Sequence, residues 1–277
     1  MKISEYPRIS SFTADNIMLV DGNGGTKTIL ISDAILAALD LTNVVNRRRI
    51  FRGKNLGSTM TAEQKAAIQD GSFKDLWLGD YWEISGVKWR IADFDYWYNK
   101  GDTAFTKHHV VIVPDTNLYT GKMNDTSTTT GGYVGSKMYT TYLATAKSTI
   151  SSVFGSNLLT HREYLINAVT SGYPSAGAWT DSSVELMNEP MVFGSYVITP
   201  SGDGSVIPKR YTNSAVQLAL FAVAPSFINS TPEGQRISYW LRDVVSASRF
   251  VRVTDYGPGT ETAPSLDYGV RPVFAIG

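Results

Sequence analysis

The sequence predicts an α+β fold: a mixed, mostly antiparallel sheet with flanking helices, preceded by a small β-hairpin and helix. Short segments that alternate apolar and polar residues recur along the chain and are typical of strands. Between them lie amphipathic segments with N-cap residues, which predict helices. The third observation is the apolar run 270–276. A free terminus is usually polar and loose, so this run predicts a strand buried inside the fold.

Composition narrows the classes of function. Hydrophobic residues make up 43% of the 277 residues and charged residues 18%, so a sizeable core is available. The formal net charge is +0, which gives no long-range attraction for nucleic acid or an anionic membrane. We therefore expect neither partner. Cysteine is absent, which excludes disulfides, thiol nucleophiles and thiolate-bound zinc.

Targeting signals are the next feature. The first ten residues, MKISEYPRIS, lack the charged and then apolar profile of a signal peptide. No stretch approaches the roughly 20 apolar residues of a membrane helix. We expect a soluble protein that does not insert into a membrane and does not use the usual export signal.

Residues 1–43 form a predicted N-terminal module, 44–58 a linker and 59–277 the main domain. In the module, NIMLVDGNGGTKTILIS predicts a hairpin around a Gly/Asn turn, and Ser32 is placed to cap a short apolar helix. So few residues bury little surface alone, and we expect the module to bind its own copies or a larger assembly. For the basic cluster 47–49 we expect solvent or contacts with carboxylates.

In the first half of the main domain, a helix is predicted to start at Thr61 and stop at Gly71. A hairpin follows around Ser85-Gly86, and a strand ends at Pro114. The Thr- and Gly-rich stretch 120–132 predicts a surface loop. The predicted covered face of the hairpin consists of Trp82, Ile84, Val87, Trp89 and Ile91.

In the second half, an amphipathic helix is predicted over 136–150, and a second over 160–169 from the T-x-x-E capping box of Thr160 and Glu163. Residues 182–198 are expected to pass from helix to strand near Pro190. The last segment, from residue 239, predicts two strands, a long Gly/Pro/Thr loop and a terminal strand. The two halves that flank the loop should be neighbours in one sheet.

The three histidines do not predict a metal centre. His108 and His109 are adjacent on a predicted strand, so their side chains point to opposite faces. His161 lies in H-x-E, half of a zinc deaminase signature whose cysteine half is missing. We expect all three to be surface or capping residues. Asp93 and Asp95 share a predicted strand face, which could suit a cation or acid/base work. Their aromatic neighbours favour a polar rim over an aromatic cluster instead: Trp89, Phe94, Tyr96 and Trp97.

Sequence signatures of catalysis are also missing. There is no G-x-S-x-G elbow, P-loop or dinucleotide fingerprint, and Asn124 and Asp125 lack the spacing of a calcium loop. We predict no catalytic residue, no metal, no cofactor and no enzymatic activity.

The end of the chain carries a resemblance. YWLRDVVSASRFVRV, a loop and then YGVRPVFAIG resemble the W-W-L-R-S … G-V-R-P ending of lectin-like domains in phages and gut Firmicutes, which have the C-type lectin fold. SFTADNIMLVDGNGGTKTILISDAILAAL is similar to attachment modules of virion proteins. The resemblance implies a C-type-lectin-like domain over 59–277 in a phage tail or capsid-surface protein made in the host cytoplasm. Residues 1–43 would contact other virion proteins.

In such relatives, the segment between the two motifs is often the variable region of a diversity-generating retroelement. The resemblance therefore implies a variable ligand-binding surface within 249–268 and its borders. The apolar residues around it would form the fixed scaffold: Trp240, Leu241, Val244, Val245, Val270, Val273, Phe274 and Ile276. The candidate ligand-binding residues are Ser248, Arg249, Arg252, Asp255, Tyr256, Thr260, Glu261, Thr262, Asp267, Tyr268 and Trp179.

The implied function is host adhesion by a tail-fibre or tail-tip receptor-binding protein. Its partner would be a host cell-surface protein or polysaccharide, and resemblance to fibre proteins implies a homotrimer. The order Asn188-Glu189-Pro190 reverses the calcium-binding motif of animal C-type lectins, so we expect no calcium-dependent sugar site. Two alternatives remain: a capsid or baseplate decoration protein without a host ligand, and a tail-associated glycan-degrading enzyme.

Overall fold

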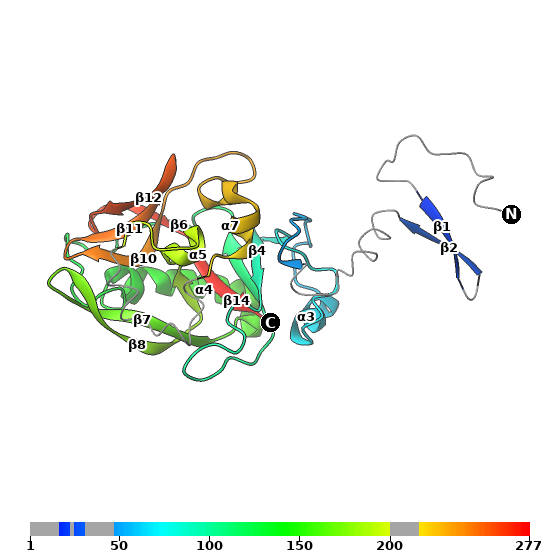
Figure 1. The fold of residues 1–277 in the computed structure, drawn as a ribbon, viewed down its shortest axis with the longest axis horizontal. Helices are drawn as coiled ribbons and strands as arrows, with labels where there is room; N and C mark the ends of the chain where they lie inside the picture. Colours follow the sequence, from blue (N-terminus) through cyan, green and yellow to red (C-terminus); the bar gives the residue numbers. More distant parts are fainter. Residues whose placement is uncertain (1–16, 23–24, 31–46, 200–215) are drawn as a thin grey trace.

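The computed structural model describes residues 17–22, 25–30, 47–199 and 216–277 (Figure 1). These residues form a mixed α+β fold of mostly antiparallel sheets and few helices, as the sequence predicts. β1 (Ile17–Gly22) and β2 (Gly25–Leu30) pair as the predicted N-terminal hairpin. The helix predicted from Ser32 lies outside the described residues.

The first five-stranded sheet has the order β3-β4-β5-β14-β9. β14 is antiparallel to both of its neighbours, and all of its residues are buried. The terminal run is thus an internal strand, and the prediction that it is buried is confirmed. In Figure 1 it appears in red within the main body. The strands are β3 (Tyr81–Ile84), β4 (Val87–Phe94), β5 (Val110–Pro114), β9 (Val184–Leu186) and β14 (Pro272–Ile276).

The predicted hairpin around Ser85-Gly86 is confirmed as β3–β4. Both turn residues have positive φ, 54° and 76°, which suits the twist of a two-residue hairpin turn. Trp82 and Trp89 are cross-strand partners and are fully buried. Of the other three residues predicted on the covered face, Ile91 is fully buried, whereas Ile84 and Val87 beside the turn are half-buried.

The second five-stranded sheet has the order β12-β11-β10-β13-β6. β10 and β13 are parallel neighbours, so the expected pairing across the predicted loop is confirmed for β13. It is wrong for the terminal strand β14, which lies in the first sheet. The long loop itself is a correction: its first part forms strand β12, whose Pro258 is tolerated because β12 is an edge strand. The strands are β6 (Tyr119–Gly121), β10 (Tyr239–Ser246), β11 (Arg249–Thr254), β12 (Gly257–Thr262) and β13 (Tyr268–Val270).

Two predicted helices are confirmed. In α3 (Ala62–Gln69), the side chain of Thr61 accepts a hydrogen bond from the backbone amide of Gln64, and the side-chain oxygen of Gln64 accepts one from the backbone amide of Thr61. Gly71 follows the helix with φ 73°. The helix predicted over 136–150 is a π-helical turn, Met138–Tyr142, that leads into α4 (Leu143–Phe154). No described helix is long and apolar enough to cross a membrane.

The helix predicted from the Thr160/Glu163 capping box is wrong. The segment is β7 (His161–Thr170), paired with β8 (Tyr173–Ser182) in a two-stranded ribbon. Burial alternates along β7, because His161, Glu163 and Leu165 are buried while the residues between them are partly exposed. Glu163 serves a buried ion pair, described below, and not a helix cap.

The order expected for residues 182–198 is reversed. β9 comes first and α5 (Glu189–Phe193) follows. Asn188 caps this helix by accepting a hydrogen bond from the Met191 amide at 2.9 Å, and Pro190 lies in its first turn, where proline is tolerated. Later in the chain come α7 (Ala219–Val223) and the 3₁₀ turn η4 (Pro225–Ile228).

Candidate functional site

The hairpin β11–β12 presents its turn to solvent. Tyr256 is 80% exposed, and Asp255 beside it is exposed as well. The turn is closed from within, because the Thr254 hydroxyl donates a hydrogen bond to the Pro258 carbonyl at 2.9 Å. Val251 and other apolar residues of β11 are fully buried. The hairpin therefore combines a fixed inner side with side chains that the fold leaves free.

Arg252 lies on β11 near this turn, with its guanidinium over the ring of Tyr268 from β13. Its guanidinium carbon is 4.0 Å from the ring centroid, a close cation–π contact. Nε donates to the Thr262 hydroxyl at 3.1 Å and Nη1 to the Ser238 hydroxyl at 2.7 Å. Three strands thus converge on one half-buried guanidinium.

The acceptor Ser238 is itself held in place. Its carbonyl accepts hydrogen bonds from the Asn117 side chain at 3.0 Å and from the Gly269 amide at 3.1 Å. Asn117 packs so closely on Gly269 that a Cβ there would lie 2.0 Å from its side-chain nitrogen. Only glycine fits this position. The site around Arg252 is built on a rigid frame.

The predicted surface divides along β11. Ser248 and Arg249 lie at one end, and Asp255 and Tyr256 lie beyond the other, about 17 Å away for a six-residue strand. At the first end, the β7–β8 turn lies against the residue that follows β10: a Cβ on Gly172 would lie 3.4 Å from Ala247. The residues expected to share one surface therefore occupy two ends of a hairpin.

The remaining strand residues occupy different faces. Thr260 is the direct cross-strand partner of Arg252 and shares its face, whereas Glu261 lies opposite Val251 on the other face and is exposed. Asp267 is exposed, with a carboxylate oxygen 3.8 Å from the Lys122 ammonium. Thr262 is a correction: it is buried and orients Arg252 through a hydrogen bond.

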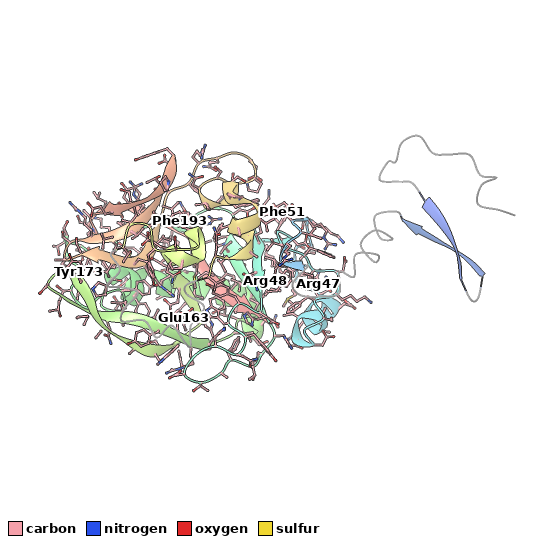
Figure 2. The ribbon with its side chains drawn as sticks, viewed as in Figure 1. Arg47, Arg48, Phe51, Glu163, Tyr173 and Phe193 are labelled. Carbon is pink, nitrogen blue, oxygen red and sulfur yellow. The ribbon has the colours of Figure 1, made fainter. Side chains whose placement is uncertain are left out.

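Trp179 is not part of this surface, which corrects its assignment. It lies on β8 opposite Tyr164, with the two rings edge to face at 5.5 Å. Trp179 is seven positions further along the chain than Gly172, the point where the ribbon meets the end of β10, which corresponds to about 23 Å of extended strand. Tyr173 is the ribbon residue at the outer tip (Figure 2).

The apolar frame is confirmed. Every residue predicted to support the surface is buried, and most are fully so. These residues are Trp240, Leu241, Val244, Val245, Val270, Val273, Phe274 and Ile276.

The expectation that the histidines are surface or capping residues is wrong for two of them. His109 is fully buried, its Nδ1 2.9 Å from the Lys107 carbonyl and its Nε2 accepting from the Trp97 amide at 3.1 Å. Burial lowers the pKa of His109 to about 3. His161 is also buried and stacks on Trp97 with ring centroids 4.0 Å apart. His108 is partly exposed and binds Asp95.

Glu163 is the buried charge that the sequence patterns missed (Figure 2). It accepts hydrogen bonds from Trp97 Nε1 at 2.6 Å and from Arg242 Nη2 at 3.1 Å, and His161 Nε2 lies 3.4 Å away. Burial alone would raise the pKa of Glu163, but Arg242, His161 and Trp97 outweigh it and lower the pKa to about 2. The ion pair joins β7 to β10. The sequence does not reveal this ion pair, because Thr160 and Glu163 have the spacing of a capping box, which predicts the start of a helix.

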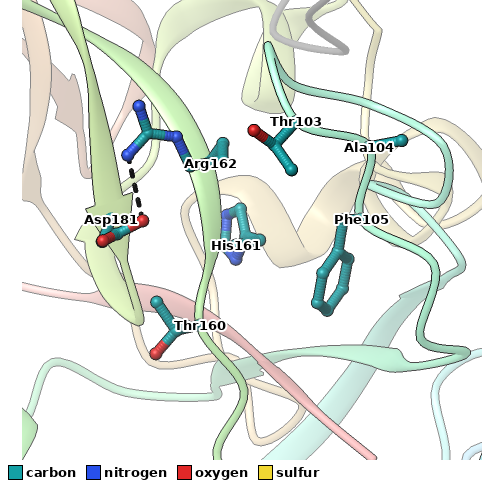
Figure 3. A pocket seen from close by; sticks show the side chains of 7 residues that line it. All are labelled: Thr103, Ala104, Phe105, Thr160, His161, Arg162 and Asp181. Carbon is teal, nitrogen blue, oxygen red and sulfur yellow. Dashed lines mark hydrogen bonds and ion pairs between the residues drawn. The ribbon is translucent and has the colours of Figure 1, made fainter.

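A hollow of about 350 Å³ opens beside this network (Figure 3). Arg162 closes one side through ion pairs with Asp181 at 3.0 Å and Asp102 at 2.8 Å. The buried Nδ1 of His161 has no hydrogen-bond partner among the described residues. The lining consists of Thr103, Ala104, Phe105, Thr160, His161, Arg162 and Asp181.

A larger groove, of about 640 Å³, lies between residues 51–53, the β3–β4 hairpin and residues 226–236. Arg90 is held between the rings of Tyr81 and Phe227, 4.7 and 4.8 Å from their centroids. At the rim, Arg236 donates to Asn229 Oδ1 at 3.1 Å, and Asn229 Nδ2 lies 3.5 Å from the Gly257 carbonyl. The groove therefore adjoins the β11–β12 hairpin.

The acidic pair expected on one strand face does not form a site. Asp93 is fully buried and pairs with Arg48 at 2.5 Å, which confirms the contact expected between the basic cluster and a carboxylate. Asp95 lies beyond the end of β4 with φ 51° and binds both neighbouring histidines. Among the described residues, no group of three His, Cys, Asp or Glu side chains is placed to hold a metal ion.

Comparisons with known proteins find no relative. The chain matches no protein-family profile, no curated protein and no solved structure.

Proposed function

We propose that this chain is a virion receptor-binding protein that adheres to the host cell surface through its β11–β12 hairpin. The observation that carries the proposal is the contrast within that hairpin between buried and exposed residues. Val251 and Val253 are fully buried, whereas Asp255, Tyr256 and Glu261 are exposed, and their side chains make no hydrogen bond or ion pair with other described residues. Exposed tyrosines and charges on a rigid element are well suited to recognition.

The main domain is proposed to be C-type-lectin-like, and the residues that carry the resemblance support this through their structural roles. Arg271 of the GVRP motif is fully buried and donates to the carbonyls of Pro114 and Phe227 at 2.9 and 2.8 Å. Trp240 of the WLRD motif is fully buried and donates to the Gly121 carbonyl at 2.9 Å. Both motifs therefore build the scaffold and leave the segment between them free to present side chains.

In this proposal, residues 1–43 attach the chain to other virion proteins and several copies act together. A homotrimer would bind the host with avidity even if each copy binds weakly. Once one copy is bound, binding by the other copies on the same particle becomes intramolecular. The attachment module is separate in function from the hairpin that binds the host.

The test compares adhesion with stability in the full chain. The triple variant Asp255→Ser, Tyr256→Ser, Glu261→Ser should lose most binding to host cells, measured by flow cytometry of labelled protein, without a change in melting temperature. Lys74→Ser, an exposed residue outside the hairpin, is the control and should bind normally. Normal binding by the triple variant would contradict the proposal. If the parent protein bound no host cell at all, a decoration role would be favoured.

A further inference from the structure

Arg252 is a positively charged group that the described residues orient but do not neutralise. Nε and one Nη1 hydrogen are used by Thr262 and Ser238, so three of the five guanidinium N–H groups remain. Nη2 has no hydrogen-bond partner among the described residues, and no described carboxylate lies within ion-pair distance. The side chain is half-buried, so its remaining donors are still open to solvent.

Most other arginines that the fold holds in place, among the described residues, differ from Arg252 in having a carboxylate partner. In most of these cases, near the surface or in the core, the carboxylate compensates the charge of the guanidinium. The arginines paired in this way are Arg48, Arg52, Arg90, Arg162 and Arg242. Arg252 is held instead by two neutral hydroxyls and an aromatic ring, an environment that preserves its charge for an external partner.

The geometry selects the chemistry of that partner. A guanidinium is planar, always charged and presents paired N–H groups that match the two oxygens of a carboxylate or phosphate. The hydrogen bonds to Thr262 and Ser238 hold the guanidinium over the ring of Tyr268, so little side-chain entropy is lost when an oxyanion binds.

A second arginine, Arg236, lies two residues before Ser238. Arg236 is exposed, Ile237 is buried, and Ser238 is half-buried, so residues 236 and 238 project to the same side of this extended segment. Ser238 is the residue that accepts from Arg252. Among the described residues, the side chain of Arg236 hydrogen-bonds only to the neutral Asn229, and Arg236 lines the 640 Å³ groove. Neither arginine forms an ion pair with a carboxylate of the described residues.

We infer that this pair of arginines binds a polyanionic surface polymer, with Arg252 receiving an oxyanion of one repeat unit and Arg236 that of another. The shared chemistry is the oxyanion, either a carboxylate of an acidic polysaccharide or a phosphate of a phosphodiester polymer. The inference rests on the proposed function, because it names the class of host ligand that the same surface would meet.

The experiment measures binding of the full chain to three immobilised polymers: polygalacturonate, polyphosphate and neutral dextran. The parent should bind at least one of the two polyanions, more weakly as salt increases, and should not bind dextran. Arg252→Gln should lower the affinity about tenfold, as expected for a charge-assisted bidentate contact. Arg236→Gln should lower it less, and Tyr268→Leu should lower it more than Tyr268→Phe, which keeps the ring.

Lys147→Gln is the matched control. Lys147 also lies over a tyrosine ring, 5.7 Å from the centroid of Tyr139, but on α4. Its removal costs the same unit of charge and should leave polymer binding unchanged. Melting temperatures of all variants are recorded, and Arg252→Lys, which keeps the charge without the fork, should retain an intermediate affinity even if Arg252→Gln folds poorly.

The outcomes separate the inference from the proposed function. If Arg252→Gln and Lys147→Gln weaken polyanion binding equally, or if no polyanion binds, the inference is wrong, while adhesion that the Asp255/Tyr256/Glu261 variant abolishes would still support the receptor-binding role. If Arg252→Gln selectively loses polyanion binding while that triple variant adheres normally, the oxyanion site stands and the proposed adhesion surface fails. Preference for polygalacturonate or polyphosphate identifies the source of the oxyanion.

Discussion

Single buried side chains set how this protein responds to acid. His109 Nε2 accepts a hydrogen bond from the Trp97 amide, and its Nδ1 faces the Lys107 carbonyl, which can only accept. The ring is therefore neutral, with its proton on Nδ1. Protonation of Nε2 would remove the acceptor and place a charge in the core beside His161, although the carboxylate of Asp95 lies 3.7 Å from Nδ1.

Stability should therefore fall as pH falls. The pKa of His109 is lowered to about 3 in the folded chain, against about 6.5 when unfolded, so its contribution is complete above pH 6.5 and is lost as pH falls towards 3. Glu163, with a pKa of about 2 against 4.5, adds a further loss below pH 4.5. Between pH 6.5 and 4.5, urea unfolding should show a steeper pH dependence for the parent than for His109→Gln, by up to about 1.4 kcal/mol per pH unit. Identical slopes would show that His109 does not titrate as described.

At the scale of the element, the β11–β12 hairpin contains both buried residues that support the fold and exposed residues that are available to a ligand. Val251 and Glu261 are direct cross-strand partners and share a face, yet the valine is fully buried and the glutamate, on the edge strand, is exposed. The difference follows from sheet order, since β12 has a neighbour on one side only.

Substitutions at these two paired positions should differ in their effect on stability. Val251→Ala should lower the free energy of unfolding by about 2 kcal/mol, through lost burial and a residual cavity. Glu261→Ser should change it by no more than about 0.5 kcal/mol, as for other exposed positions. Urea unfolding of the full chain measures both. Equal losses at the two positions would mean that the edge strand β12 is as constrained as β11.

The elements predicted well are those with local signals. The Thr61 cap, the Ser85-Gly86 turn and the apolar terminal run each specify their structure within a few residues. The Thr160–Glu163 pattern failed because β7 depends on pairing with β8 and on a buried partner, Arg242, that is 79 residues away in sequence. The site was predicted in part for the same reason: the exposed turn at Asp255 and Tyr256 follows from composition, whereas the stacking of Arg252 on Tyr268 needs three strands to converge.

At the scale of the whole molecule, the end of the chain links the surface to the core. β13 carries Tyr268 in the second sheet, and after the single residue Arg271 the chain enters β14 in the first sheet. There Phe274 packs against Trp89 and Phe154, with ring centroids 5.7 and 5.4 Å away. The surface is therefore anchored directly to the aromatic core. The sequence predicts the burial of the terminal strand but not this change of sheet, which depends on pairing with distant β5 and β9.

The central claim is that the fold does not depend on the side chains it presents on the hairpin. The most direct measurement is a library of the full chain randomised at Asp255, Tyr256, Thr260, Glu261 and Asp267, with melting temperature and host-cell binding recorded for each member. We expect most members to melt within a few degrees (about 2–4 °C) of the parent, while binding ranges from parental to undetectable. Melting temperatures that fall together with binding, or binding that survives every substitution, would contradict the account.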